Sequence, residues 1–175
     1  SVLIPARYSS SRFPGKPLIE LNGRTMIQRV YERATKSKAA AVYVATDDER
    51  IADSVYEIGG KVVMTEANHE SGSDRIYEAA SALGLRDDEV VVNVQGDEPL
   101  IPPEAIDQVA RLVGQKTRMA TLMTTLRNAE EVFDPNVVKV VADNTGQALY
   151  FSRAPIPWSR DQVQSGDKSL TNKTA

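Results

Sequence analysis

A basic loop that runs from Arg7 to Lys16 carries the strongest chemical signal in this sequence. Its letters, ARYSSSRFPGKP, place Arg7, Arg12 and Lys16 among three serines and beside one glycine. Arginine and lysine neutralise phosphate oxygens, while serine hydroxyls and backbone N–H groups next to a glycine add further donors. Pro14 and Pro17 stiffen the segment, which a solvated charged loop does not require. The loop therefore predicts a polyphosphate site, with a solvated basic loop as the alternative.

The basic loop matches neither of two widespread nucleotide-binding patterns. Both GxxxxGK[ST] and GxGxxG are absent from the sequence. These glycine-rich patterns define P-loop and dinucleotide-binding sites respectively. Their absence argues against a dehydrogenase.

Two adjacent carboxylates, Asp97 and Glu98, follow an apolar run at 90–94. Gly96 precedes them and permits close backbone approach. Magnesium takes one or two carboxylates and completes its shell with waters and substrate phosphates, so one aspartate suffices as an anchor. Asp97 is therefore a candidate magnesium ligand. The alternative is that one of these carboxylates caps the helix that Pro102 and Pro103 introduce.

A third polar loop, HESGSDR, begins at the only histidine, His69, and leads into a predicted helix. Arg75 can reach back from that helix toward a ligand, whereas helix capping explains Ser71, Ser73 and Asp74 equally well. Without a cysteine or a second histidine as partner, His69 is better explained as a surface residue than as a catalyst or ligand.

Arg153 lies in a proline-rich segment, FSRAPIPW, that also carries the only tryptophan, Trp158. An anion site for a second substrate is one interpretation. A loop packed on the Trp158 ring is the other, and the residues alone do not separate the two.

The composition sets limits on partners and location. The net charge is −3, so the surface as a whole does not attract nucleic acid or an anionic membrane. Cysteine is absent, which removes disulfides and thiolate chemistry. No apolar run approaches the roughly 20 residues of a membrane span. We therefore expect a cytoplasmic protein without nucleic-acid or membrane partners.

The elements that must position these loops follow from the hydrophobic pattern. Short apolar runs predict buried strands at 2–4, 41–45, 61–64 and 90–94. Apolar residues at helical spacing predict helices through 26–34, 51–58 and 76–83. Asp47 or Asp48 and Ser71 or Ser73 can cap helix starts, while glycines at 59–60 and 84 follow helix ends. Alternating strands and helices predict a doubly wound α/β domain with a mostly parallel sheet, and ligands bind such sheets at the carboxyl ends of the strands.

The pattern changes after a further helix through 106–113. Candidate strands follow at 119–126, 137–141 and 147–151, and DNTG at 143–146 is typical of a hairpin turn. We expect an antiparallel extension of the sheet, within a single domain that spans 1–175.

Six motifs, taken together, resemble those of the 3-deoxy-manno-octulosonate cytidylyltransferases, or CMP-Kdo synthetases. They are IPARYSSSRFPGKPL, VATDDERI, HESGSDR, VVNVQGDEPLIP, DPNVVKVV and ALYFSRAPIPW, and they extend through essentially the whole chain. Enzymes that activate sialic acid, methylerythritol phosphate or N-acetylglucosamine phosphate share the sheet and a basic first loop. Those enzymes differ around PGKPL and QGDEP, and they remain the nearest alternatives.

The resemblance implies a fold of the nucleotide-diphospho-sugar transferase type and a magnesium-dependent reaction. CTP and the acid sugar Kdo would become CMP-Kdo and pyrophosphate, for lipopolysaccharide biosynthesis. The residues that it places on the triphosphate are Arg7, Ser10, Arg12 and Lys16, and Asp97 would bind magnesium. Those near the cytidine are the Ala6 backbone, Ser71, Gly72 and Arg75. Gln95 and Arg153 would lie on the Kdo side, and the full-length protein would be a homodimer.

One departure from the family concerns the carboxyl-terminal portion. Family members continue through a GIYGYR-like stretch and a DTPEDL-like segment that supplies a second metal ligand, and neither occurs in this sequence. We therefore expect that this chain lacks the family's carboxyl-terminal portion. A nucleotide-binding module without catalysis is the rival from another functional class.

Overall fold

The computed structural model describes residues 1–9, 13–114 and 117–158. The chain divides into two compact units, Ser1–Thr121 and Leu122–Ala175. Each unit is described by itself below.

The first unit is built on a parallel sheet of four strands. These strands are β1 (Val2–Ala6), β2 (Val42–Thr46), β3 (Val62–Met64) and β4 (Val92–Asn93), in the order β3-β2-β1-β4. All four predicted strands are confirmed. Strand β4 is shorter than expected, with two paired positions, although the Val94 N–H still donates to the Leu3 carbonyl at 3.1 Å.

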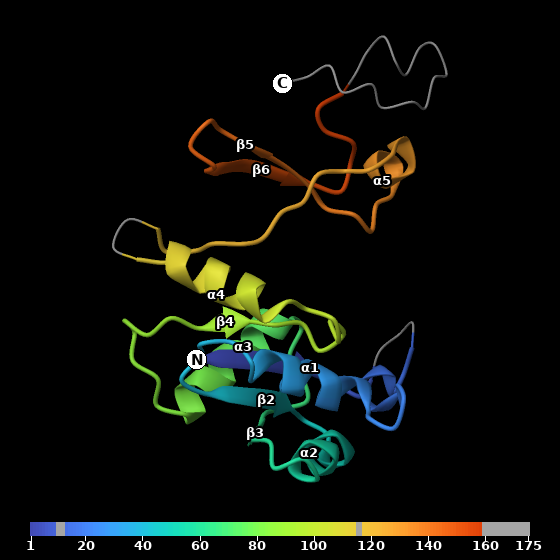
Figure 1. Ribbon diagram of the computed structural model, residues 1–175, viewed down its shortest axis with the longest axis vertical. Coiled ribbons are helices and arrows are strands. Elements are labelled where there is room, and N and C mark those ends of the chain that lie inside the picture. The colour runs from blue at the N-terminus through green and yellow to red at the C-terminus, as the bar shows by residue number, and fades with distance from the viewer. Residues whose placement is uncertain (10–12, 115–116, 159–175) are drawn as a thin grey trace. The chain divides into compact units, whose positions relative to one another are not determined.

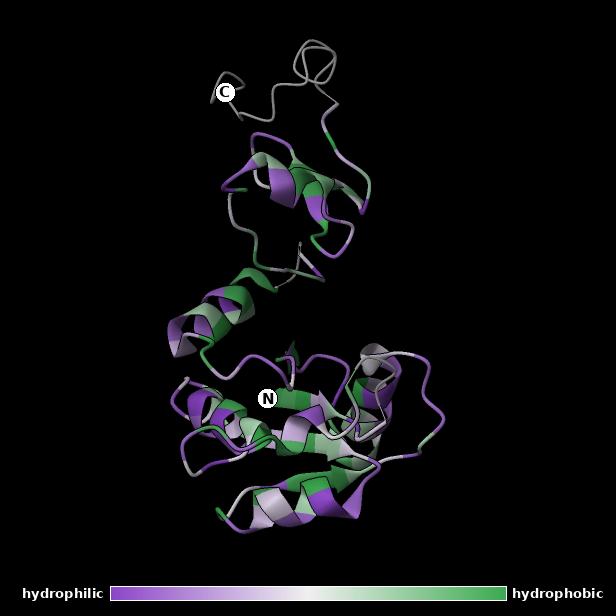
Figure 2. Cartoon of the chain, turned by 90° about the vertical axis from the view of Figure 1, so that its right-hand side faces the viewer, coloured by the Kyte–Doolittle hydropathy of each residue, from purple (hydrophilic) through white to green (hydrophobic). Residues whose placement is uncertain are grey.

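Four α-helices cover the two faces of this sheet, as Figure 1 shows: α1 (Met26–Ala34), α2 (Glu49–Tyr56), α3 (Gly72–Ala82) and α4 (Pro103–Leu112). Alternate residues of β1 serve different faces. Val2 and Ile4 pack with apolar side chains of α1, α2 and α4, whereas Leu3 packs with Ala79 of α3. Hydrophobic colouring accordingly follows the strands, while the helices are mixed (Figure 2). The doubly wound α/β prediction is confirmed.

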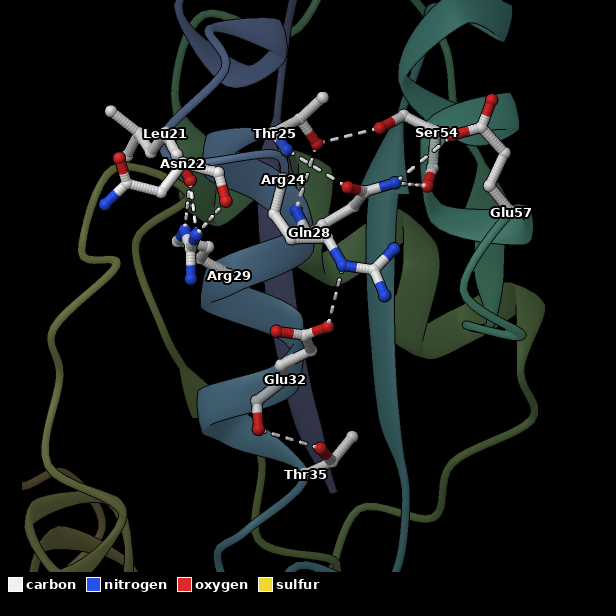
Figure 3. Close-up of polar contacts among 10 residues, drawn as sticks. All are labelled: Leu21, Asn22, Arg24, Thr25, Gln28, Arg29, Glu32, Thr35, Ser54 and Glu57. Atoms are coloured by element: carbon white, nitrogen blue, oxygen red, sulfur yellow. Dashed lines mark hydrogen bonds and ion pairs between the residues drawn. The ribbon is translucent and has the colours of Figure 1, made fainter.

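A buried polar network joins the start of α1 to α2 (Figure 3). Thr25 and Gln28 form a capping box, in which each side chain accepts a hydrogen bond from the other residue's backbone N–H. The Gln28 side chain, 3% exposed, also donates to the Ser54 carbonyl at 2.7 Å. Helix starts leave backbone donors unpaired, so this network both caps α1 and fixes it against its neighbour.

The strand order reverses direction at β1. The chain runs from β1 outward to β2 and β3, then crosses to the other side of β1 to form β4. In open α/β sheets, ligands bind beside the carboxyl ends of the strands at such a switch point. The loops after β1 and β4 are therefore the place to look for a site.

The second unit contains α5 (Ala129–Phe133) and an antiparallel pair, β5 (Lys139–Ala142) and β6 (Ala148–Ser152). The predicted hairpin turn is confirmed, with Gly146 at a φ of 84°. This pair forms a two-stranded sheet of its own. The predicted strand at 119–126 is wrong, because this irregular segment has no strand to pair with among the described residues.

The longest helix in the described parts of the chain has 11 residues, and none is long and apolar enough to cross a membrane.

Candidate active site

A pocket of about 160 Å³ lies at the switch point between β1 and β4. Three segments line it: the end of β1, the loop that enters α3, and the residue that follows Val94. The lining residues are Pro5, Ala6, Arg7, His69, Ser71, Gly72, Arg75 and Gln95. Six of them, Ala6, Arg7, Ser71, Gly72, Arg75 and Gln95, are residues that the sequence predicted for the site. The fold therefore brings together positions up to 89 residues apart (6 to 95).

A larger cavity, of about 340 Å³, lies at the opposite ends of the strands beside Ser1, Val90 and Val92. It contains none of the predicted site residues, and its position is contrary to where parallel sheets bind ligands. The smaller pocket is therefore the better candidate.

Gly96 shows why the loop after β4 can approach β1 so closely. A Cβ atom at this position would lie 2.9 Å from the Pro5 carbonyl oxygen, closer than real Cβ atoms come. The sequence-based expectation of close backbone approach at Gly96 is confirmed. This approach sets Gln95 and Asp97 beside the end of β1.

Lys16 and Asp97, which do not themselves line the pocket, form an ion pair between the loops that follow β1 and β4, with 2.6 Å between Nζ and Oδ2. Lys16 begins a short 3-10 helix, η1 (Lys16–Leu18), after Gly15 at a φ of 74°. Pro17 is the buried residue of this helix. Both charged side chains are close to half exposed, at 41% and 48%. The candidate phosphate-binding lysine and the candidate metal ligand thus neutralise each other.

Arg75 is buried, with a side chain only 3% exposed, and it is engaged by its own protein. Its guanidinium lies 3.0 Å from the Asp47 carboxylate and donates to the Thr65 hydroxyl. The Asp47 Oδ1 atom is buried and has this guanidinium as its close partner. Arg75 therefore forms a fixed wall of the pocket.

The loop entering α3 combines capping with pocket lining. Ser71 caps the helix, accepting from the Asp74 N–H at 3.2 Å, and Asp74 completes the capping box. His69 binds the Glu78 carboxylate through Nε2, an interaction that, with the Glu66 N–H, lowers the pKa of Glu78. His69 also lines the pocket, so its surface-loop interpretation was incomplete.

An aromatic contact at the basic loop was not predicted from the sequence. The Arg50 guanidinium stacks on the Tyr8 ring, 3.4 Å from its centroid. Asp48, which caps α2, accepts two hydrogen bonds from the same guanidinium, and these lower the pKa of Asp48. The VATDDERI motif contained this signal, as three acidic residues after a strand followed by an arginine.

Two of the predicted triphosphate residues, Ser10 and Arg12, lie outside the described residues. Arg153 belongs to the second unit, where its guanidinium donates to the Pro135 carbonyl at 2.8 Å. The Arg153 carbonyl accepts a hydrogen bond from the buried Lys139 ammonium, which also donates to the carbonyls of Asp134 and Val137. Trp158 is 61% exposed.

The donor set around Asp97 fits a magnesium ion that arrives with a nucleotide. Within the described part of the chain, no three His, Cys, Asp or Glu side chains gather into a cation site. A single half-exposed carboxylate is compatible with an ion held mainly by phosphate oxygens and water. Magnesium at Asp97 stays a prediction.

Comparison with known proteins gives this arrangement a family. A family model described as cytidylyltransferase matches residues 1–171. The chain is 55% identical, over 168 residues, to the 3-deoxy-manno-octulosonate cytidylyltransferase of Vibrio vulnificus strain YJ016, covering 95% of this chain and 67% of that protein. The enzyme of the same name from Saccharophagus degradans is 55% identical over 175 residues, with 99% and 69% coverage. The chain belongs to the 3-deoxy-manno-octulosonate cytidylyltransferase family.

Solved structures place the fold in the same family. A CMP:2-keto-3-deoxy-manno-octonic acid synthetase complexed with CTP matches with a TM-score of 0.77 and 38% identity, over 93% of this chain and 67% of that one. A cytidylyltransferase from Leptospira borgpetersenii matches with a TM-score of 0.56 and 28% identity, over 64% and 47%. The chain spans about two thirds of the length of the Vibrio and Saccharophagus enzymes and of the CTP-bound synthetase.

Proposed function

We propose that this protein transfers CMP from CTP to 3-deoxy-D-manno-octulosonate (Kdo), giving CMP-Kdo and pyrophosphate. The observation that carries the proposal is the switch-point pocket of a family member, lined by Arg7 and Arg75. Lys16 and Asp97, which form an ion pair, belong to the loops that follow the same two strands, β1 and β4.

The basic residues have separate tasks in this proposal. Arg7 is exposed at the mouth of the pocket and can bind phosphate. Arg75 and the Ser71–Gly72 turn are assigned to the cytidine, and Arg75 is already held in place by Asp47. Ser10 and Arg12 are assigned to the triphosphate on the family motif. Gln95, at the edge of the pocket, and Arg153 are assigned to Kdo.

Binding of CTP requires Lys16 and Asp97 to exchange partners. Lys16 turns from the carboxylate to the outer phosphates, which frees Asp97 for magnesium. When bound, the ion would offset negative charge on the triphosphate and on the departing pyrophosphate. An ion pair this exposed contributes at most about 1 kcal/mol, so phosphate can displace the carboxylate readily.

The chemistry then depends on position and charge. The anomeric hydroxyl of Kdo attacks the α-phosphorus in line and releases its proton to solvent. The bond from the α-phosphorus to the oxygen of the β-phosphate breaks, and negative charge develops on the leaving pyrophosphate. Arg7 and Lys16 stabilise that charge from the basic loop. The pocket walls hold the nucleotide in register while the bond exchange occurs.

A pyrophosphate-release assay tests this function. The full-length protein, mixed with CTP, magnesium and Kdo, should release pyrophosphate, and omission of Kdo should abolish release. Asp97→Asn should lower turnover by about 100-fold, since charge stabilisation by the ion is worth several kcal/mol. Glu98→Gln, at the neighbouring exposed carboxylate, serves as the matched control and should retain activity. Unchanged turnover in Asp97→Asn would refute the metal assignment.

We also infer that the full-length protein is a cytoplasmic homodimer that supplies lipopolysaccharide biosynthesis. The family motifs support this inference, as do the exposed side chains of Leu149, Tyr150 and Phe151 on β6, at 51–65% exposure. Light scattering during size-exclusion chromatography should give twice the chain mass. A monomer at micromolar concentration would contradict the inference.

A further inference from the structure

We propose that Arg50 is a positioning residue for the basic loop, acting through Tyr8 and never touching the nucleotide. This inference rests on the proposed function, because its consequence is the affinity for CTP. Its basis is a chain of contacts that runs from the start of α2 to the base of the loop.

The outer end of this chain is a fixed guanidinium. Asp48 accepts from Arg50 Nε at 2.9 Å and from Nη2 at 2.6 Å. The same carboxylate accepts from the Arg50 backbone N–H at 3.0 Å, which ties it to the first turn of α2. A bidentate pair of this kind fixes the plane of the guanidinium as well as its position.

That plane lies on Tyr8, which closes the base of the loop. The guanidinium carbon is 3.4 Å from the ring centroid, and Tyr8, which is partly buried, also packs against the core. The Tyr8 carbonyl accepts from the Gly15 N–H at 2.9 Å. A Cβ at Gly15 would come within 3.1–3.3 Å of the same ring, which would have to shift by a few tenths of an ångström, and the φ of 74° at this position also favours glycine.

The two candidate phosphate ligands directly flank this closure. Arg7 precedes Tyr8, and Lys16 follows Gly15. Fixing Tyr8 and Gly15 relative to each other therefore fixes where both cations start. A loop held in its binding geometry before the ligand arrives has less conformational entropy to lose on binding.

Two other roles for Arg50 are less consistent with these contacts. Its side chain is 58% exposed, so the core does not depend on its volume. Its charge is already matched by Asp48 at 2.6 Å, which makes it a poor free cation for phosphate. Its planar, charged guanidinium can stack on the Tyr8 ring and bind Asp48 in a bidentate manner at the same time, which a lysine ammonium would not reproduce.

Steady-state kinetics with CTP as the varied substrate separate these roles. Arg50→Ala and Tyr8→Leu should each raise KM for CTP about five-fold with kcat changed less than two-fold, the size expected from losing one exposed cation–π contact. Tyr8→Phe keeps the ring and should stay within about two-fold of the parent protein. The double variant should be no worse than either single variant, because both remove the same contact.

Several outcomes would overturn the proposal. Unchanged KM in Arg50→Ala would do so, as would additive effects in the double variant. Full activity in Arg50→Lys would show that charge alone matters. Melting temperatures of all variants should stay close to that of the parent, and a large common drop would assign the stack to stability.

Hydrogen exchange of the Gly15 amide tests the clamp, meaning the contacts from Arg50 through Tyr8 to Gly15, without any substrate. Exchange at Gly15 should accelerate in Arg50→Ala and Tyr8→Leu and stay unchanged in Tyr8→Phe. If the parent protein releases no pyrophosphate but these exchange rates follow this order, the proposed function fails and the clamp stands. Uniform exchange at Gly15 across the variants would refute the clamp itself.

Discussion

Two ion pairs near the pocket, Lys16–Asp97 and Arg75–Asp47, differ in how deeply they are buried. Lys16 and Asp97 are about half exposed, whereas Arg75 is 3% exposed against Asp47 at 14%. Breaking an exposed pair costs little, but removing one partner of a buried pair leaves an uncompensated charge. Lys16 is therefore the residue that can exchange partners when a nucleotide binds, and Arg75 is the one that cannot.

This distinction predicts how Lys16 contributes to affinity. Lys16→Ala should lower the affinity for CTP by about ten-fold or more, which is the scale of a hydrogen bond to a charged group. It should lower the affinity for CMP far less. The reason is that the lysine is assigned to the outer phosphates, which CMP lacks. Isothermal titration with both nucleotides measures the difference. Lys36→Ala, at an exposed lysine just after the end of α1, is the control. Equal loss of affinity for CTP and CMP in Lys16→Ala would contradict the placement of Lys16 on the outer phosphates.

The His69–Glu78 contact predicts a pH dependence of stability. The pKa of Glu78 is lowered from its ordinary value of 4.5, first by His69 and then by the Glu66 N–H. A lowered folded-state pKa contributes stability that is present above the unfolded pKa and is lost as the pH falls through the folded pKa. The difference in urea midpoint between the parent and Glu78→Gln should thus be full at pH 6 and shrink below about pH 4.5. A difference that does not vary with pH would argue against the contact.

At the scale of elements, the start of α1 depends on one buried amide. Gln28 accepts from the Thr25 N–H and donates to the Ser54 carbonyl, so it joins the cap of α1 to α2 (Figure 3). Helix α1 follows the basic loop and η1 in the chain, and Leu18 and Tyr8 pack against the core that α1 helps to form. The network therefore supports the loop from below.

Truncation of this amide should destabilise the first unit. Gln28→Ala removes these two hydrogen bonds and a third, to the Glu57 carboxylate. It leaves the Ser54 carbonyl without this donor, at an expected cost of about 2–3 kcal/mol. Urea unfolding followed by circular dichroism at 222 nm measures the change. Gln108→Ala, at an exposed position of α4, should shift the midpoint by less than about 0.5 kcal/mol. Equal midpoints for the two variants would show that the network is dispensable.

At the scale of the whole molecule, affinity for anions is local. The net charge of −3 gives no general attraction, so binding of a triphosphate has to come from the cations at the switch point. The described contacts that form the pocket all lie within the first unit, Ser1–Thr121. Nucleotide binding should therefore stabilise the folded state of that unit directly.

Thermal unfolding provides the measurement. CTP with magnesium at about 100 times its Kd should add roughly 2.7 kcal/mol to the stability of the folded state and raise the melting temperature by about 5–10 °C. CMP at the same concentration should raise it less, since it cannot engage Lys16. A melting temperature that rises equally with CTP, CMP and inorganic phosphate would show that the site does not distinguish the nucleotide from simple phosphate.

The sequence by itself determined the elements and the chemistry of the loops. Periodicity placed α1 to α4 and the four parallel strands, because alternation of apolar residues is a local property of each segment. Local turn chemistry likewise placed the hairpin at Gly146 and narrowed the caps to Asp47 or Asp48 and to Ser71 or Ser73, of which the structure uses Asp48 and Ser71. Local signals failed at 119–126, where apolar residues suggested a strand that has no partner in the described structure.

Only the tertiary structure decided which of these residues meet. The pairing of Lys16 with Asp97 joins positions 81 apart in the chain, and the stack of Arg50 on Tyr8 joins the first turn of α2 to the loop after β1. Neither contact can be predicted from hydrophobic periodicity, because each depends on the order in which strands pair across the sheet. The sequence thus supplied a basic loop and a carboxylate, and the reversal of strand order at β1 made them one site.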